Sequence, residues 1–175
     1  KGSGDPKLVT EQLWLLVNEL RNLPLKIIEG NIIGDDSFFD KNKRVKTWIK
    51  NPGAQAYEAP LGALSFNFNT VKVYVSPGKR IGAPADIVIE PENEYIKLKN
   101  NATTLKPGIR NRLIVNRIGK EDHDLITVTG GINLGQPRAH YFLNITHPTQ
   151  YALNVLKSYL KISGIKFDGK LLEGR

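Results

Sequence analysis

The segment that decides the fold runs from residue 30 to residue 69 and holds two motifs, GNIIGDDSFFD at 30–40 and YEAPLGALSFNFN at 57–69. The first motif predicts an apolar strand that ends in an acidic turn at Gly34-Asp35-Asp36. The second leads through a proline into an apolar stretch of small residues. Between them lie few regular patterns and many polar and aromatic residues. Because a long irregular connection bounded by two strands is more often functional than idle, we expect a functional loop here.

The composition is that of an ordinary globular protein with a basic surface. The 175 residues suffice for one large domain or two small subdomains, and 40% of them are hydrophobic. The net charge of +8 favours an anionic partner, such as nucleic acid, a membrane surface or an acidic cell-wall polymer, although a merely basic soluble surface explains it equally. The lysines and arginines are scattered rather than gathered in a run, so we expect no nucleic-acid partner.

The sequence gives no sign of a metal or a cofactor. Cysteine is absent, so neither a disulfide nor a thiolate zinc site can form. His123, His140 and His147 lack the spacing of metal ligands, and the acidic residues around His123 at 121–124 are typical of a solvated turn. We therefore expect no metal and no cofactor.

The chain begins at Lys1, without a methionine and without an apolar leader. It also has no apolar run long enough to cross a bilayer, so we expect no transmembrane segment. We interpret the sequence as a piece of a longer polypeptide, part of whose function resides in residues outside it.

Two helix–strand units of the same layout lie near the two ends of the sequence. The first is a helix at 10–21 followed by a strand at 26–33, and the second is a helix at 150–161 followed by a strand at 165–171. We expect the two units to pair in one small α/β layer. In the first helix the expected cap is Thr10, and the expected core residues are Leu13, Trp14, Leu16, Val17 and Leu20.

The middle of the sequence predicts a β-rich, antiparallel region. Residues 61–75 predict a hairpin, and further short strands follow at a spacing of about ten residues, at 83–90, 95–100, 113–117, 125–129 and 139–145. The expected fold class is therefore α+β, with a β-rich middle and two flanking helix–strand units that form a small α/β layer. We expect an α/β subdomain at 1–60 plus 139–175 and a β-rich subdomain at 61–138.

Two short motifs match those of serine enzymes, but their surroundings argue against catalysis. Ser76 begins an S-x-x-K motif, yet Pro77-Gly78 prevents the helix that would point the lysine at the serine. Ser65 begins an S-x-N motif in a predicted strand, where nothing activates it. Lys-Thr-Gly and a G-x-S-x-G elbow are both absent. We therefore expect no catalytic residue in this chain.

The ordered set of motifs resembles a known protein family. The motifs are GSGDPKL before a helix, IIEGNIIGDDSFFD, Trp48, YEAPLGALSFNFN, the segment ending in Pro-Gly at 73–78, ITVTGGI, HPTQYALNVLKSYLKISGI and FDGKLLEG. Together they resemble the insertion of class C low-molecular-mass penicillin-binding proteins, the D-alanyl-D-alanine carboxypeptidase/endopeptidase family. The resemblance covers nearly the whole chain and keeps its order.

The resemblance implies that this chain forms accessory domains beside a catalytic domain that it lacks. In that family the insertion follows the S-x-x-K serine and precedes the S-x-N motif. The parent enzyme is a periplasmic or extracytoplasmic serine-type peptidase that hydrolyses peptidoglycan stem peptides, or cross-links between them, through an acyl-enzyme that β-lactams trap. The implied partners are the catalytic domain of the same protein and, through the parent enzyme, the stem peptide.

The resemblance also implies a substrate-binding loop. In such enzymes a tryptophan, an acid and a tyrosine before Ala-Pro approach the active site, and the matching residues here are Trp48, Asn51 and Tyr57. The two rings pack on the aliphatic stem of a diamino-acid side chain, while a carboxylate binds its ammonium group. Asn51 is not an acid, which leaves Glu58 as a substitute. The alternative is that Trp48 and Tyr57 only pin the loop to the core.

Three other functions stay open from the sequence. The first is a stand-alone cell-wall-binding or interaction module without catalytic activity. The second is a basic nucleic-acid-binding domain, which would bind DNA with a steep salt dependence. The third is an unrelated hydrolase built around His123 or His140.

Overall fold

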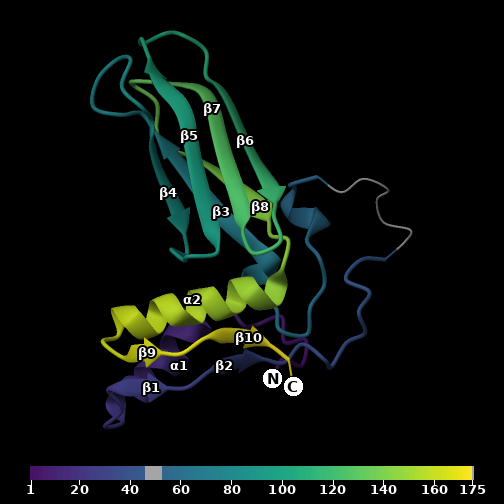
Figure 1. The fold of residues 1–175 in the computed structure, drawn as a ribbon. Coiled ribbons are helices and arrows are strands. Elements are labelled where there is room, and N and C mark those ends of the chain that lie inside the picture. Colours follow the sequence, from purple (N-terminus) through teal and green to yellow (C-terminus); the bar gives the residue numbers. More distant parts are fainter. Residues whose placement is uncertain (46–52, 175) are drawn as a thin grey trace.

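The structure, a computed structural model, describes residues 1–45 and 53–174. Within them, two α-helices and ten strands in four small sheets confirm the α+β fold class (Figure 1). The helices are α1 (Thr10–Asn22) and α2 (Pro148–Ile162), and two short 3₁₀ turns are η1 (Ala56–Glu58) and η2 (Asn67–Asn69). The strands are β1 (Ile27–Glu29), β2 (Ile32–Gly34), β3 (Thr70–Ser76), β4 (Asp86–Glu90), β5 (Ile96–Leu105), β6 (Arg112–Gly119), β7 (Asp124–Asn133), β8 (Ala139–Asn144), β9 (Lys166–Asp168) and β10 (Leu171–Glu173).

The two helix–strand units near the ends form one layer, as we expected. β1 pairs in parallel with β9, with Ile28 opposite Phe167, β2 pairs in parallel with β10, and α1 packs on α2. Each expected strand is in fact two short strands, because a glycine interrupts it. Gly30 has a φ of +89°, and a Cβ on Gly169 would stand 1.8 Å from the Gly30 carbonyl oxygen, so the paired breaks require glycine.

A residue far along the chain caps helix α1. The Thr10 N–H donates a hydrogen bond to Oδ1 of Asn67 at 2.9 Å, and Nδ2 of Asn67 donates to Oγ1 of Thr10 at 2.9 Å. The expectation that Thr10 is the cap was wrong, because Thr10 is the first helical residue and Val9 holds the cap position. The start of α1 is thereby fixed to the turn η2.

The buried face of α1 is narrower than we expected. Leu13 and Val17, one turn apart, are buried against the core. Trp14 was wrong as a core residue, because it lies about 100° further round the helix and is 54% exposed. Leu16 is exposed for the same reason. Neither helix of the described residues combines the length and the apolar character that crossing a membrane requires.

The chain before β3 is irregular, so the expected hairpin of residues 61–75 was wrong. Asn67, Phe68 and Asn69 have φ values of +48°, +55° and +55°, and this left-handed turn replaces the strand that the alternation suggested. A left-handed conformation costs about 1 kcal/mol or more for a residue such as Phe68. The turn is nevertheless fixed, since the Asn69 amide donates to the Pro60 carbonyl oxygen at 2.8 Å.

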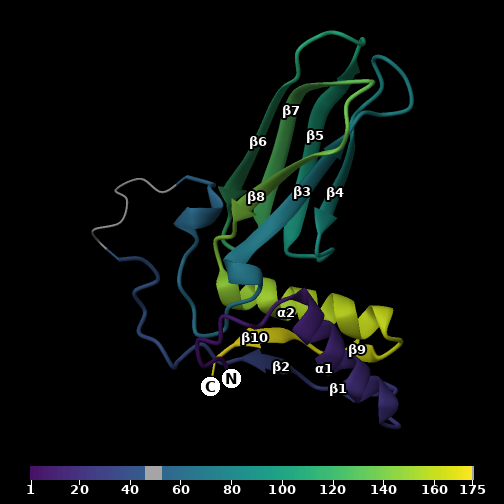
Figure 2. The ribbon, with the colours of Figure 1, turned by 180° about the vertical axis from the view of Figure 1, so that it is seen from behind.

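The two larger sheets pack face to face as a sandwich, and Figure 2 shows the β4–β3–β8 sheet from its outer side. β3 pairs antiparallel with both β4 and β8, and β6 pairs antiparallel with β7. β5 and β7 run parallel, so the β-rich region is not purely antiparallel; β6, between them in sequence, lies on the far side of β7. The residues that meet between the sheets are at most 1% exposed: Val71, Val73, Val75, Ile126, Val128 and Ile132.

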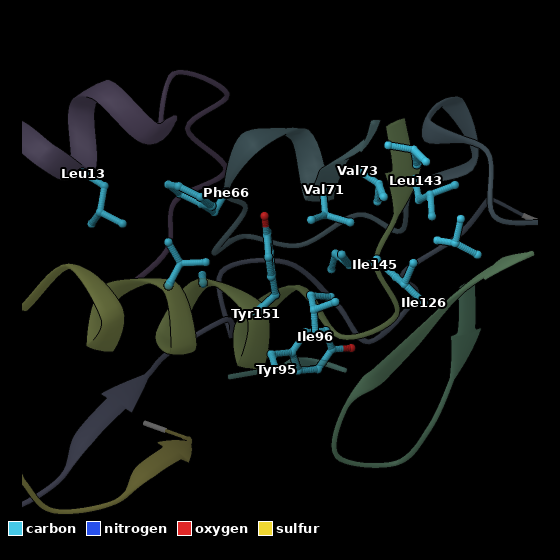
Figure 3. Close-up of a cluster of buried hydrophobic side chains, with 14 of the residues drawn as sticks. Leu13, Phe66, Val71, Val73, Tyr95, Ile96, Ile126, Leu143, Ile145 and Tyr151 are labelled. Carbon is cyan, nitrogen blue, oxygen red and sulfur yellow. The ribbon is translucent and has the colours of Figure 1, made fainter. Parts of the chain in front are cut away.

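Tyr151 of α2 joins the sandwich to the α/β layer (Figure 3). Its ring centroid lies 5.8 Å from that of Phe66 and 6.1 Å from that of Tyr95, and its hydroxyl donates to the Thr70 carbonyl oxygen at 3.0 Å. Burial raises the pKa of Tyr151 above its ordinary value, which keeps the hydroxyl protonated as a donor. Strand β8, which our division placed with the α/β subdomain, is hydrogen-bonded to β3 of the sandwich.

We predict that Ile126→Ala lowers the free energy of unfolding by about 2–5 kcal/mol, because Ile126 is fully buried between the two sheets. Urea denaturation measures the change. The matched control is Ile114→Ala on the outer face of the β5–β7–β6 sheet, where the side chain is 67% exposed. The control should change stability by no more than about 0.5 kcal/mol. Equal losses in the two variants would contradict the sandwich.

Candidate functional site

The three residues expected to bind substrate are only partly described by the structure. Trp48 and Asn51 lie outside the described residues. Tyr57 lies in η1, and its side chain is 78% exposed. A ring with this exposure is not pinned to the core, so that interpretation was wrong for Tyr57.

The connection that leads to these residues starts at the acidic turn predicted from the sequence. The Asp35 carboxylate accepts hydrogen bonds from the Ser37 hydroxyl at 2.6 Å and from the Ser37 N–H at 2.9 Å. These bonds, with a smaller contribution from Lys1 at 3.5 Å, lower the pKa of Asp35 to about 2. The neighbouring Asp36 carboxylate accepts from the Leu64 N–H at 2.7 Å, which ties the turn to the second motif.

Residues 43 and 44, on the N-terminal side of the loop to which Trp48, Asn51 and Tyr57 belong, are fixed by ion pairing and hydrogen bonds. Lys43 forms a salt bridge with Asp36, and its carbonyl oxygen accepts from the Leu61 N–H at 2.7 Å. The Arg44 guanidinium donates to the carbonyl oxygen of Glu58. These contacts bring residues 43 and 44 beside residues 58–61.

Residues on the C-terminal side of the loop are fixed to strand β8 through Asn144. Nδ2 of Asn144 donates to the carbonyl oxygens of Gly53 at 3.0 Å and of Gln55 at 2.9 Å. The backbone N–H of Asn144 donates to the carbonyl oxygen of Ala54 at 3.0 Å. Gln55 also forms an antiparallel bridge with Leu143. The segment is therefore held against the edge of β8 by one isolated β-bridge and the hydrogen bonds of Asn144.

Arg117 and Asp124 extend this anchor into the sandwich. The Arg117 guanidinium donates to Oδ1 of Asn144, to the Gly53 carbonyl oxygen at 3.2 Å and to Oγ1 of Thr146 at 2.8 Å. The fully buried Asp124 carboxylate in turn accepts from the Thr146 hydroxyl at 2.5 Å and from the Thr146 N–H at 2.8 Å. The assignment of Asp124 to a solvated turn was therefore wrong. We call these four side chains, Arg117, Asp124, Asn144 and Thr146, the loop anchor.

Glu58 lies buried beside the loop anchor. Its side chain is only 8% exposed, and a Cβ on Gly53 would lie 3.1 Å from its Oε2 atom. Oε2 has no hydrogen-bond partner within residues 1–45 and 53–174. Burial lowers the pKa of Arg44, the positive charge of Arg117 acts in the same direction, and the nearby Glu58 carboxylate opposes both. Two guanidinium groups and one carboxylate thus meet at the base of the loop.

The two serines of the short sequence motifs both lie outside helices. Ser65, wrongly placed in a strand, lies in the irregular segment before η2, where its hydroxyl donates to the Gly62 carbonyl oxygen at 2.7 Å. Ser76 ends β3, and its hydroxyl accepts from Nε of Arg138 at 3.3 Å. Neither hydrogen bond supplies a base that would activate a serine. In the part of the chain that the structure describes, no three His, Cys, Asp or Glu residues form a group that could hold a metal.

Sequence reasoning missed the loop anchor. Its members lie on β6, on β7, at the end of β8 and just before α2, so no motif links them. The one available signal was the position of Asp124 at the start of an apolar strand, where a buried acid needs hydrogen-bond donors.

Comparison with known proteins shows the family of this chain. The sequence pattern of the D-Ala-D-Ala carboxypeptidase 3 (S13) family matches residues 1–175, and the chain belongs to this family. A relative from Actinomadura sp. (strain R39), named D-alanyl-D-alanine carboxypeptidase, is 27% identical over 96% of this chain and 32% of its own length. D-alanyl-D-alanine carboxypeptidase DacB of Haemophilus influenzae is 25% identical over 97% of this chain and 35% of its own length. The chain therefore spans about a third of these relatives.

Two solved structures share the fold. Penicillin binding protein 4 (dacB) from Haemophilus influenzae superposes with a TM-score of 0.72 at 21% identity, over 98% of this chain and 38% of that one. The same protein complexed with a novel beta-lactam superposes with a TM-score of 0.62 at 16% identity, over 99% of this chain and 36% of that one.

We predict that Asn144→Ala loosens residues 53–58, because it removes the side-chain donor for Gly53 and Gln55. Amide hydrogen exchange in this segment should accelerate at least about tenfold, and the free energy of unfolding should fall by about 1–3 kcal/mol. Asn101→Ala, an exposed asparagine on β5, is the matched control and should leave the exchange of this segment unchanged. Unchanged protection in the Asn144 variant would contradict the anchor.

Proposed function

We propose that this chain is the accessory, non-catalytic part of a serine-type D-alanyl-D-alanine carboxypeptidase/endopeptidase that hydrolyses peptidoglycan stem peptides and binds penicillin. Family membership over residues 1–175 and the names of the two relatives support the reaction class. The chain spans about a third of the length of those relatives, which is consistent with one part of a protein that also has a catalytic domain. Within the parent protein we place the chain in the periplasm or another extracytoplasmic location.

The observation that carries the proposal is that the Tyr57 ring is exposed although the backbone on either side of it is fixed by hydrogen bonds. The segment that bears it is bound to β8 by Asn144 and to Arg44 by the Glu58 carbonyl oxygen, yet the ring itself remains in solvent. Folding gains little from an exposed tyrosine, whereas a bound ligand gains much from a ring held in a fixed place. We infer that Trp48, Asn51 and Tyr57 bind the diamino-acid side chain of the stem peptide.

The positions of the two ends support a place inside a larger protein. The Gly2 N–H donates to the Asp35 carbonyl oxygen at 2.7 Å, and the Gly174 N–H donates to the Gly34 carbonyl oxygen at 3.1 Å. The ends therefore lie side by side next to β2, as Figures 1 and 2 show. An inserted domain needs its ends close together, because both must return to the host domain.

The surface beside these ends supports a docked catalytic domain of the same protein as partner. Phe38 and Phe39 pack on each other with ring centroids 5.5 Å apart and are 60% and 44% exposed. Adjacent exposed aromatic rings are typical of an interface core. We propose two accessory regions: the α/β layer beside the catalytic domain, and the β sandwich beyond it, with β8 and α2 joining them.

We predict that Tyr57→Ala in the longer protein lowers kcat/KM for a D-Ala-D-Ala peptide with a free diamino-acid side chain by about tenfold, since about 1.4 kcal/mol of ring contact is lost. Steady-state release of D-alanine measures the change. Tyr57→Phe, which keeps the ring, should stay within about twofold of the unchanged protein.

The control substrate is the same peptide without the diamino-acid side chain. Its hydrolysis and the rate of acylation by penicillin should not change in the Tyr57→Ala variant, because neither uses the ring. An equal loss on both peptides would contradict the substrate-binding role. A longer protein that fails to react with penicillin would contradict the enzyme assignment itself.

A further inference from the structure

The outer face of the β4–β3–β8 sheet carries aromatic and cationic side chains that the proposed substrate loop does not use. Along β3, valines point into the sandwich, so the alternate residues Lys72 and Tyr74 point outward. On β8 the exposed residues of this face are His140 and Phe142. With Phe68 from η2 and Arg138 before β8, these residues form what we call the aromatic face; it lies on the side of the β4–β3–β8 sheet that Figure 2 presents.

The cations of the aromatic face lie over its rings. Nζ of Lys72 is 4.6 Å from the Tyr74 ring centroid and 5.3 Å from that of Phe142, and the Arg138 guanidinium is 4.9 Å from that of Tyr74. His140 meets Phe142 edge-on at 5.8 Å. Among the described residues neither cation forms a salt bridge with an acid, although Glu90 lies opposite Lys72 in the sheet. Both cations therefore retain hydrogen-bond donors for a ligand.

Phe68 is held out of the core by its own backbone. It stands in the left-handed turn between Asn67 and Asn69, whose side-chain amides bond to Thr10 and to the Pro60 carbonyl oxygen. The turn is thus fixed from both sides, and Phe68 is left 67% exposed. A strained turn that holds an aromatic ring in water is typical of a binding site, because neither the strain nor the exposure helps folding.

Phe68 and Phe142 line a groove at the end of the aromatic face that adjoins η2. The groove has a volume of about 340 Å³ and is also lined by Lys72, Glu11 and Glu90. This volume is within the range of small-ligand sites. The walls thus combine two exposed rings with one cation and two carboxylates. A matching ligand has a flat apolar surface for the rings, hydroxyl donors for the carboxylates and an acidic group for the cation.

We propose that the aromatic face binds a glycan strand that carries carboxylates. The C–H side of a sugar ring packs on the electron-rich face of an aromatic ring, hydroxyls donate to Glu11 and Glu90, and sugar carboxylates pair with Lys72 and Arg138. The net charge of +8 adds long-range attraction for an anionic polymer. The identification of this strand with the glycan of the cell wall rests on the function proposed above. The binding of an acidic glycan as such is inferred from the aromatic face alone.

The test uses the longer protein that contains this chain and measures affinity for two probes by calorimetry. One probe is a peptide-free peptidoglycan glycan strand, which carries carboxylates, and the other is the neutral β-1,4-linked tetramer of N-acetylglucosamine. Phe142→Ala and Phe68→Ala should weaken the binding of both probes about tenfold or more. Lys72→Gln should weaken the binding of the acidic strand about tenfold and that of the neutral tetramer less than twofold.

Ile114→Ala on the outer face of the other sheet is the matched control and should change neither affinity. Phe68 and Phe142 are both exposed, and Lys72→Gln removes the charge but keeps a polar side chain with most of the aliphatic stem, so all variants should unfold at the same temperature as the unchanged protein within a few degrees.

Penicillin labelling of the same samples separates the two proposals. Variants that lose glycan affinity and keep labelling support the aromatic face. A protein that binds glycan through this face but never labels would contradict only the enzyme assignment. No glycan binding by the unchanged protein, equal weakening by Ile114→Ala, or binding of duplex DNA in place of glycan would overturn the inference.

Discussion

The hydrogen bonds of Arg117 with Asn144, Thr146 and Gly53 are the interaction on which the rest of the site depends. A guanidinium has fixed geometry and five donors, so a single side chain can connect the sandwich, the start of α2 and the base of the loop. The buried Asp124 carboxylate supplies the opposite charge through Thr146. Together with the Glu58 carboxylate at the base of the loop, Asp124 balances the charge of the half-buried arginine.

The packed core holds the base of the loop in place, although most residues around that base have no regular secondary structure. Tyr151 carries the packing of α2 into the foot of the sandwich, where it meets Phe66 and Tyr95. A single cluster of buried side chains therefore runs from Leu13 in the layer to Ile132 in the sandwich. Because protein interiors are close-packed, movement of the layer against the sandwich would open cavities, so the two parts hold the described residues at the base of the loop in one place.

The sequence predicted those parts of the structure that local patterns determine. Both helices, the pairing of the end units and most strands followed from apolar periodicity, as with the alternating valines of β3. The hairpin before β3 failed because Phe66 and Phe68 alternate as in a strand, while left-handed asparagines with distant partners turn the chain. For the candidate site, motif order pointed to Tyr57, but the loop anchor draws on three strands and the segment before α2 and could be found only in the folded chain.

We propose that this chain places and presents substrate-binding groups for a serine enzyme whose nucleophile lies elsewhere. The most direct test is to label the purified 175-residue chain with a fluorescent penicillin beside the product of the complete gene. We expect a covalent adduct only on the complete product, because Ser65 and Ser76 lack an activating base in their hydrogen bonds. A covalent adduct on the 175-residue chain itself would contradict the account.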